Sequence, residues 1–267
     1  MDDVVLYEKR DGIATITLNR PDRMNAWTGQ LSDALLAYLG EADGDDEVVV
    51  VVITGAGKAF CAGADLGDGE SGFFPVSADN DGRPRLWPYQ VRKPVIAAVN
   101  GHAVGVGITV AMLCDIRIVS QDAKIQYAMV RRGVVPELAS HVILPRIVGF
   151  SRAAELMLTG RMMSGVEAAD LGLASRAVPA DDVLAEAKSL ASELVRDASP
   201  VALAVSKQLL WQGVTMSVEE MLGREARVIS SIARMPDAVE GVKAFFERRD
   251  AVWAGSVNDS ADGLLGL

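Results

Sequence analysis

Two segments decide the fold: residues 55–66, GAGKAFCAGADL, and residues 98–107, AVNGHAVGVG. The first follows the run VVVVVIT at 48–54, and the second begins within the run VIAAVN at 95–100. Such runs of mostly β-branched or small apolar residues are typical of a strand buried on both faces. Glycine and alanine allow a ligand or another segment to come close to the backbone. The second segment also opens a predicted helix over 105–113, whose first N–H groups lack intrahelical acceptors. We therefore expect two turns that present free N–H donors.

The flanking sequence predicts a strand-rich first part and a helical last part. Apolar runs at 4–9 and 13–18 surround Asp11-Gly12, which indicates a β-hairpin. Helical spacing covers 28–42, a further strand is predicted at 116–120, and 67–90 is expected to form a long surface loop. Helices are predicted at 140–148, 151–159, 166–171, 181–197, 200–211, 217–233 and 237–248, and a frayed tail after Ala254. The fold class is therefore α/β.

Composition excludes several classes of partner. The chain has 267 residues and a formal charge of −10, from 36 acidic and 26 basic residues, which argues against nucleic acid or an anionic membrane as partner. The two cysteines form no CxxC pair, and no metal site is predicted. No run of 18 apolar residues and no signal peptide are recognised, so we expect a cytoplasmic protein that does not enter the membrane.

The two glycine-rich turns do not match the common nucleotide-binding motifs. A dinucleotide site would need glycine where Val110 stands, and a P-loop would need Ser or Thr after Lys58, where Ala59 stands. Taken singly, each turn also reads as a plain strand-to-helix connection. Taken together, they can direct two backbone N–H groups at one carbonyl oxygen. Such an oxyanion hole stabilises the enolate of a thioester.

Five segments carry a resemblance to a known family. FCAGADL (60–66), AVNGHAVGVG (98–107), CDIRIVS (114–120), the opening TLNRPDRMNA (17–26) and LTGRMMSGVEAADLGLASRAVP (158–179) resemble the enoyl-CoA hydratase/isomerase (crotonase) family, in that family's order. The resemblance spans about residues 4–250. It implies a spiral of strand-strand-helix turns, expected over 1–198 with the CoA and acyl site, and a C-terminal helical trimerisation region over 199–267. It also implies an acyl-CoA substrate, no separate cofactor because coenzyme A is part of that substrate, and a homotrimer or a dimer of trimers.

The resemblance also implies roles for individual residues. Ala64 and Val106 occupy the positions that supply the two oxyanion N–H groups, although the family usually has glycine at the second position. Hydratases of the family use two glutamates to activate water, and the matching positions here are Thr109 and Met129. Neither is a carboxylate, so the usual two-glutamate mechanism is not supported by this chain.

One carboxylate remains nearby. Residues 131–137, RRGVVPE, resemble the branch of the family with a Pro-Glu at this place, where a glutamate moves the proton in enoyl-CoA isomerases. A single base facing a stabilised enolate suffices for a 1,3 proton shift. Burial in an apolar pocket would make Glu137 a better base. The alternative is that Glu137 is the N-cap or first-turn acid of the helix at 140–148.

Further residues are expected around the substrate. Arg23 is a candidate for the CoA phosphates, and Asp65 is placed to cap a helical turn after the first glycine-rich segment. Trp87 and Tyr89 can contact the acyl chain. The predicted substrate-binding set is Arg23, Ala62, Asp65, Gly105, Thr109 and Met129.

Four functions follow from these residues. The leading hypothesis is double-bond isomerisation of enoyl-CoA with Glu137 as the acid/base. The second is an enoyl-CoA hydratase of fatty acid metabolism with a non-standard residue set, and the third is a non-catalytic acyl-CoA binding protein. A serine hydrolase using Ser140 and His141 is disfavoured, because the chain lacks a GxSxG elbow.

Overall fold

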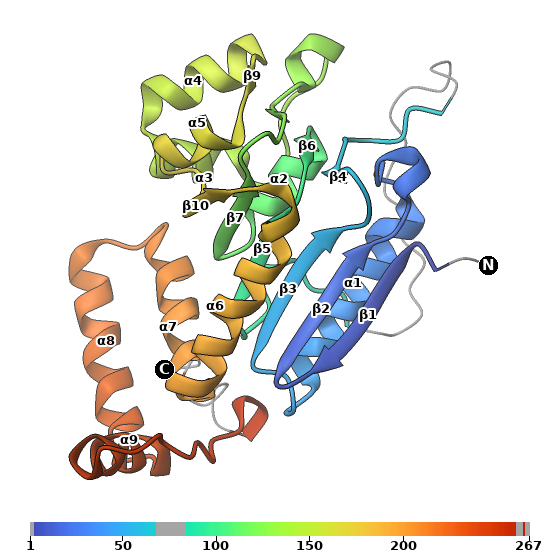
Figure 1. Cartoon of the computed structure of the whole chain (residues 1–267). Coiled ribbons are helices and arrows are strands. Elements are labelled where there is room, and N and C mark those ends of the chain that lie inside the picture. The colour runs from blue at the N-terminus through green and yellow to red at the C-terminus, as the bar shows by residue number, and fades with distance from the viewer. Residues whose placement is uncertain (1–2, 68–83, 260–263, 265–267) are drawn as a thin grey trace.

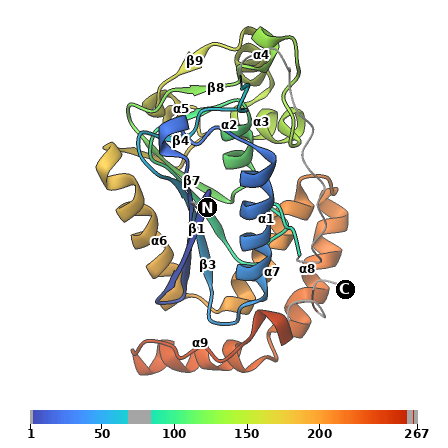
Figure 2. The same ribbon diagram turned by 90° about the vertical axis from the view of Figure 1, so that its right-hand side faces the viewer.

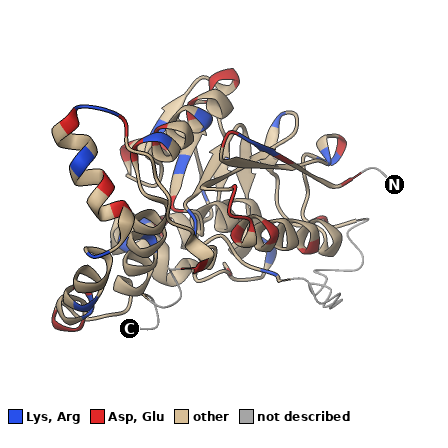
Figure 3. Cartoon of the chain, turned by 90° about the horizontal axis from the view of Figure 1, so that it is seen from below, with Lys and Arg blue, Asp and Glu red and all other residues tan. Residues whose placement is uncertain are grey.

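The computed structural model describes residues 3–67, 84–259 and 264. Most of the loop predicted at 67–90 lies outside these residues. Within them, the chain forms two sheets and a set of helices around them (Figure 1). The described part contains no helix that is long and apolar enough to cross a membrane. Basic and acidic residues are interspersed along the described chain (Figure 3).

The larger sheet has six strands in the order β1-β2-β3-β5-β7-β10. The predicted hairpin is confirmed: β1 and β2 are antiparallel, and both Asp11 and Gly12 have the positive φ that such a tight turn favours. All other neighbours in this sheet are parallel. The strands are β1 (Val5–Arg10), β2 (Ile13–Leu18), β3 (Val50–Gly55), β5 (Val95–Val99), β7 (Ile116–Ser120) and β10 (Arg176–Val178).

Helices cover both faces of this sheet. Helix α1 (Gly29–Gly44) lies on one face and α6 (Val183–Asp197) on the other, as Figure 2 shows. Alternate residues of β3 therefore belong to two different apolar clusters, Val51 and Ile53 to the α1 side and Val50 and Val52 to the α6 side. This two-sided burial explains the uninterrupted apolar run at 48–54.

A smaller sheet continues from the carboxyl ends of the larger one. It has four strands in the order β4-β6-β8-β9, namely β4 (Ala59–Cys61), β6 (His102–Val104), β8 (Ile125–Gln126) and β9 (Met162–Met163). Strands β3, β5 and β7 are each followed by a short strand, and β5 and β6 lead into helix α2 (Val106–Met112), which is the expected strand-strand-helix turn. The first glycine-rich segment, 55–66, was expected to form a turn, but it also contains the strand β4. Strands of two or three residues are too short to show a period in the sequence.

The other predicted helices are confirmed to within two residues at each end. They are α3 (Ser140–Val148), α4 (Phe150–Thr159), α5 (Gly165–Asp170), α7 (Pro200–Gly213), α8 (Val218–Ile232) and α9 (Pro236–Glu247), and short 3-10 turns occur at Pro21–Arg23, Met129–Arg132 and Ala180–Asp182. Side chains cap α1, α5, α7 and α8 through Thr28, Ser164, Ser199 and Ser217.

The chain after α9 is held in place, so the prediction of a frayed tail is wrong up to residue 259. The N–H groups of Ala254 and Gly255 donate to Asp237, and Asn258 bonds both Gly44 and Arg92. These polar contacts could not be predicted from the local sequence, because they join residues that are far apart along the chain. The division of the chain at residue 198 stays a prediction.

Candidate active site

The two glycine-rich turns lie against each other. Strands β4 and β6 pair in parallel, so the turns that follow them are neighbours. A methyl group added at Gly105 would lie 3.7 Å from the Cα atom of Gly63, and one added at Gly107 would lie 2.1 Å from the carbonyl oxygen of Cys61. Glycine is therefore required at 107, because any side chain there would push α2 away from β4.

Both turns leave a backbone N–H without a backbone acceptor. Trp27 forms a β-bridge with Ala64, in which the Trp27 N–H donates to the Gly63 carbonyl and the Asp65 N–H donates to the Trp27 carbonyl. Val106 is the first residue of α2, where N–H groups have no intrahelical partner. Among the backbone hydrogen bonds of the described residues, none has the Ala64 or Val106 nitrogen as donor.

A cavity of about 340 Å³ opens beside these two amides. It brings together six of the predicted site residues, namely Ala62, Ala64, Gly105, Val106, Met129 and Glu137. The remaining described lining is Trp27, Gly63, Leu66, Val104, Ala128, Arg132, Val134 and Val135. Glu137 is the only carboxylate in this described lining, and Arg132 is the only cation.

Thr109 is not in the described lining of the cavity, but it forms a hydrogen bond with Glu137, which is. Its side chain is fully buried in α2, and its Oγ1 lies 2.7 Å from Oε1 of Glu137 and 3.1 Å from the Val106 carbonyl oxygen. The hydroxyl donates to the carboxylate, which fixes where that carboxylate points. Glu137 itself is exposed, so burial in an apolar pocket does not activate it as a base.

The turn that carries Glu137 is strained. Leu138 and Ala139, directly after it, have φ values of 53° and 56°, a left-handed conformation that costs non-glycine residues of order 1–2 kcal/mol each. Ser140 holds this turn, because both its N–H and its hydroxyl donate to the Glu137 carbonyl. Such strain is typical of functional sites. The alternative role for Glu137 is wrong, since Ala139 is the N-cap of α3 and its first turn has no acidic residue.

Arg23 and Asp65 are not part of the described cavity lining. They pair with each other, with Arg23 Nη2 3.1 Å from one Asp65 oxygen, and Arg20 binds the other oxygen at 2.9 Å. The Arg20 hydrogen bond and the Gly67 N–H lower the pKa of Asp65. The carboxylate thus joins the start of the chain to the turn at 62–67, and its prediction as a substrate-binding residue is not supported by this placement. The helical turn expected after Asp65 would extend outside the described residues.

The serine hydrolase alternative does not fit the geometry, and Cys61 is not an activated nucleophile either. Ser140 is 1% exposed and its hydroxyl is used by the Glu137 carbonyl, whereas His141 is exposed. Burial raises the pKa of Cys61 to about 12, so this thiol stays protonated and is a poor nucleophile. Within the described residues, no group of three or more His, Cys, Asp or Glu side chains is placed to hold a metal ion.

Sequence reasoning missed three residues of this region. Trp27 lines the cavity and carries the β-bridge to Ala64, and Arg20 anchors Asp65. Arg132 lines the cavity near Glu137, and its Nη1 donates to the Ala128 carbonyl at 3.3 Å. The signal for Arg132 was present, since a basic pair directly precedes the Gly-Val-Val-Pro-Glu segment.

Comparisons with known proteins identify the family of this chain. The family model for enoyl-CoA hydratase/isomerase matches residues 8–256. An enoyl-CoA hydratase from Alternaria alternata is 36% identical over 260 residues, covering 96% of this chain and 88% of that protein, and a 2,3-dehydroadipyl-CoA hydratase from Escherichia coli is 34% identical over 247 residues, covering 92% and 96%. The crystal structure of an enoyl-CoA hydratase from Mycobacterium tuberculosis superposes with a TM-score of 0.87 at 31% identity, covering 96% of this chain and all of that chain. The chain belongs to the enoyl-CoA hydratase/isomerase (crotonase) family.

Proposed function

We propose that this protein is an enoyl-CoA isomerase that moves a double bond from C3–C4 to C2–C3 of an acyl thioester, with Glu137 as its single acid/base. The observation that carries the proposal is that Glu137 is the only carboxylate among the described residues that line the cavity beside the Ala64 and Val106 amides. Its position is set by the Thr109 hydroxyl at 2.7 Å.

The proposed reaction begins with the thioester oxygen accepting hydrogen bonds from the N–H groups of Ala64 and Val106. Glu137 removes a proton from C2, and the electron pair of the C2–H bond delocalises onto the thioester oxygen and along the C3–C4 double bond. The two amides stabilise the resulting dienolate, a contribution typically worth about 3 kcal/mol for each donor. Glu137 then returns the proton to C4, so no water or cofactor is consumed.

Hydration of a 2-enoyl-CoA is the second candidate, because relatives of this chain carry that name. Addition of water needs one group to take the proton from the water and a second to protonate C2. This chain has Thr109 and Met129 where the hydratases carry glutamates, and Met129 has no proton to exchange. Glu137 would have to fill both roles, which makes hydration the less favoured reaction.

We also propose that the C-terminal helices mediate self-association into trimers, as the family resemblance implies. In α8 and α9, Leu222, Ile229, Phe245 and Phe246 are all at least 60% exposed. Large apolar surfaces of this kind usually mark a protein interface. Sedimentation velocity of the full chain tests this, and a monomer at all concentrations would contradict it.

The proposed chemistry is tested by turnover of a 3-enoyl-CoA and a 2-enoyl-CoA, each with the native protein and with Glu137→Gln. We expect the 3-enoyl thioester to be converted to the 2-enoyl isomer, and Glu137→Gln to lose at least about a hundredfold in kcat, the usual scale of a general base. Binding of a saturated acyl-CoA should be retained in the variant, which serves as the control for folding. Hydration of the 2-enoyl thioester without isomerisation would favour the second candidate.

A further inference from the structure

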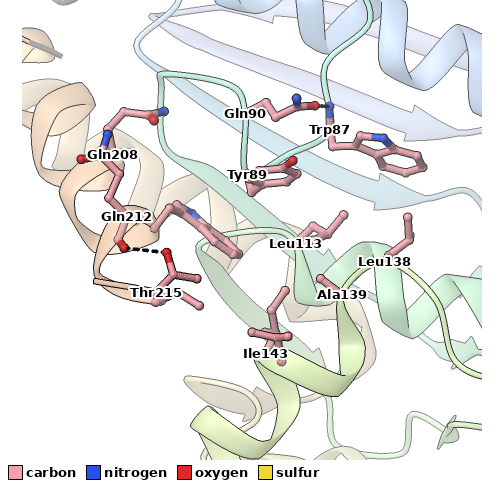
Figure 4. A pocket seen from close by; sticks show the side chains of 13 residues that line it. Trp87, Tyr89, Gln90, Leu113, Leu138, Ala139, Ile143, Gln208, Gln212 and Thr215 are labelled. Atoms are coloured by element: carbon pink, nitrogen blue, oxygen red, sulfur yellow. Dashed lines mark hydrogen bonds between the residues drawn. The ribbon is translucent and has the colours of Figure 1, made fainter. Parts of the chain in front are cut away.

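A second, larger cavity is lined in part by the two residues that directly follow Glu137. Its volume is about 690 Å³, and Figure 4 shows it between the segment at 87–90, helix α7 and the start of α3. The described lining is Trp87, Tyr89, Gln90, Leu113, Leu138, Ala139, Val142, Ile143, Gln208, Trp211, Gln212, Val214 and Thr215. No residue in that lining is charged.

This cavity adjoins the first one along two chain segments. On α2, Leu113 follows Thr109 by one helical turn and therefore lies on the same side of the helix. After Glu137, the next two residues, Leu138 and Ala139, line the second cavity. Glu137 thus lines the first cavity directly before the residues that line the second. The rise from Val106 to Leu113 is about 10 Å, so the second cavity begins about that far from the oxyanion amides.

Aromatic side chains dominate one part of this lining. Tyr89 and Trp211 have ring centroids 5.5 Å apart at an angle of 51°, and Trp87 lies two residues before Tyr89. Aromatic rings gain most from packing against another ring in an offset or tilted arrangement.

A buried polar network fixes these aromatic walls. Lys207 donates to the carbonyl oxygens of Pro88 and Lys93 at 2.8 and 2.9 Å, and it pairs with Asp115 at 2.8 Å. The indole N–H of Trp211 donates to the second Asp115 oxygen at 2.7 Å. Both walls are therefore attached to the same ion pair, and the cavity is held open in a defined shape.

We infer that the second cavity receives the distal part of the acyl group, and that the preferred acyl group is uncharged and bears a ring. The inference rests on the proposed function, because it assumes that the thioester is held at Ala64 and Val106. A terminal carboxylate is disfavoured, since it would lose water in a space where no described lining residue offers a cation. Trp211 is assigned as a specificity-determining residue.

The test is calorimetric binding of saturated acyl-CoA thioesters, which do not react, to the full-length protein. Three acyl groups are compared: one ending in a phenyl ring, a straight chain with the same number of carbons, and that straight chain with a terminal carboxylate. We expect the phenyl-ended thioester to bind about tenfold more tightly than the straight chain, and the carboxylate to bind more weakly than either.

Variants assign the preference to the cavity. Trp211→Leu should remove the preference for the ring, whereas Trp211→Phe should keep most of it. Trp253→Leu is the matched control, because Trp253 lies outside the described lining of this cavity. Gln208→Arg should improve binding of the carboxylate-ended thioester about tenfold. The Gln208→Arg measurement still tests the inference if Trp211→Leu does not fold.

The outcomes separate this inference from the proposed function. Equal or tighter binding of the straight chain, or tight binding of the carboxylate by the native protein, would overturn the inference while isomerase turnover and its loss in Glu137→Gln still stand. If the native protein shows the ring preference in binding but does not isomerise a 3-enoyl-CoA, only the isomerase proposal would be overturned. Failure of every thioester to bind would overturn both.

Discussion

The hydrogen bond between Thr109 and Glu137 gives a sharp prediction. Replacing Thr109 by valine keeps the shape of the side chain but removes the hydroxyl that lies 2.7 Å from Oε1 of Glu137. A hydrogen bond to a charged group contributes about 1.5–3 kcal/mol, and the exposure of Glu137 allows water to replace part of it. We therefore expect a loss of about 1.4 kcal/mol in transition-state stabilisation, which is about a tenfold fall in kcat.

Steady-state turnover of a 3-enoyl-CoA measures this effect, and calorimetric binding of a saturated acyl-CoA should be unchanged in the same variant. Thr109→Ser is the matched control: it restores the hydroxyl and should keep near-native kcat while losing about 1 kcal/mol of stability from the missing methyl group. Native kcat in Thr109→Val together with a reduced kcat in Thr109→Ser would refute the reasoning, because packing rather than the hydroxyl would then matter.

Three further predictions follow from contacts around the site. Gly107→Ala places a methyl group 2.1 Å from the Cys61 carbonyl oxygen, so it should displace the oxyanion turn and lower kcat in the same assay at least about a hundredfold. Gly44→Ala is the control: the position is exposed, a methyl group there meets no atom within 4 Å, and kcat should stay unchanged. Lys207→Met leaves the partly buried Asp115, whose side chain is 17% exposed, without its ion-pair partner. It should lower the free energy of unfolding in urea by about 3 kcal/mol, the lower end of the range for a buried pair; an unchanged urea midpoint would contradict this. Burial lowers the pKa of Lys93 to about 8 from its ordinary 10.5, so between these pH values the folded chain binds fewer protons than the unfolded chain. The free energy of unfolding should therefore rise with pH in this range. The urea midpoint should be higher at about pH 10 than at about pH 8, and Lys93→Met should lose this rise.

The elements that the sequence predicted well are those with a long local pattern. The apolar run at 48–54 became β3, buried on both faces, and the helical spacing after residue 140 became α3 to α9. The short strands of the smaller sheet were missed, since a strand of two or three residues has no period of its own. The two amide-bearing turns were expected from their glycines and from the strands before them.

The site itself was predictable in part. Ala64, Val106, Met129 and Glu137 do surround one cavity, which the family resemblance implied. The exposure of Glu137 and its bond to Thr109 were not predictable, because they depend on a contact between segments 28 residues apart.

Long-range ion pairs were the second source of error. Asp65 was expected to serve the ligand or a helix, but Arg20 and Arg23 bind its carboxylate across more than 40 residues of sequence. The Lys207–Asp115 pair, which fixes the walls of the second cavity, also joins residues 92 apart and gives no local signal. Charged residues that organise a site from a distance are therefore found only once the fold is known.

The most direct test of the central claim is product analysis by NMR after the native protein acts on a 3-enoyl-CoA in deuterated water. A single base that serves both C2 and C4 predicts the 2-enoyl thioester as the first product, with hydrogen or deuterium added at C4 and no hydroxyl group at C3. Product should form at least about a hundredfold more slowly in Glu137→Gln. Formation of a 3-hydroxyacyl thioester as the main product from the 2-enoyl isomer, or full activity in Glu137→Gln, would contradict the account.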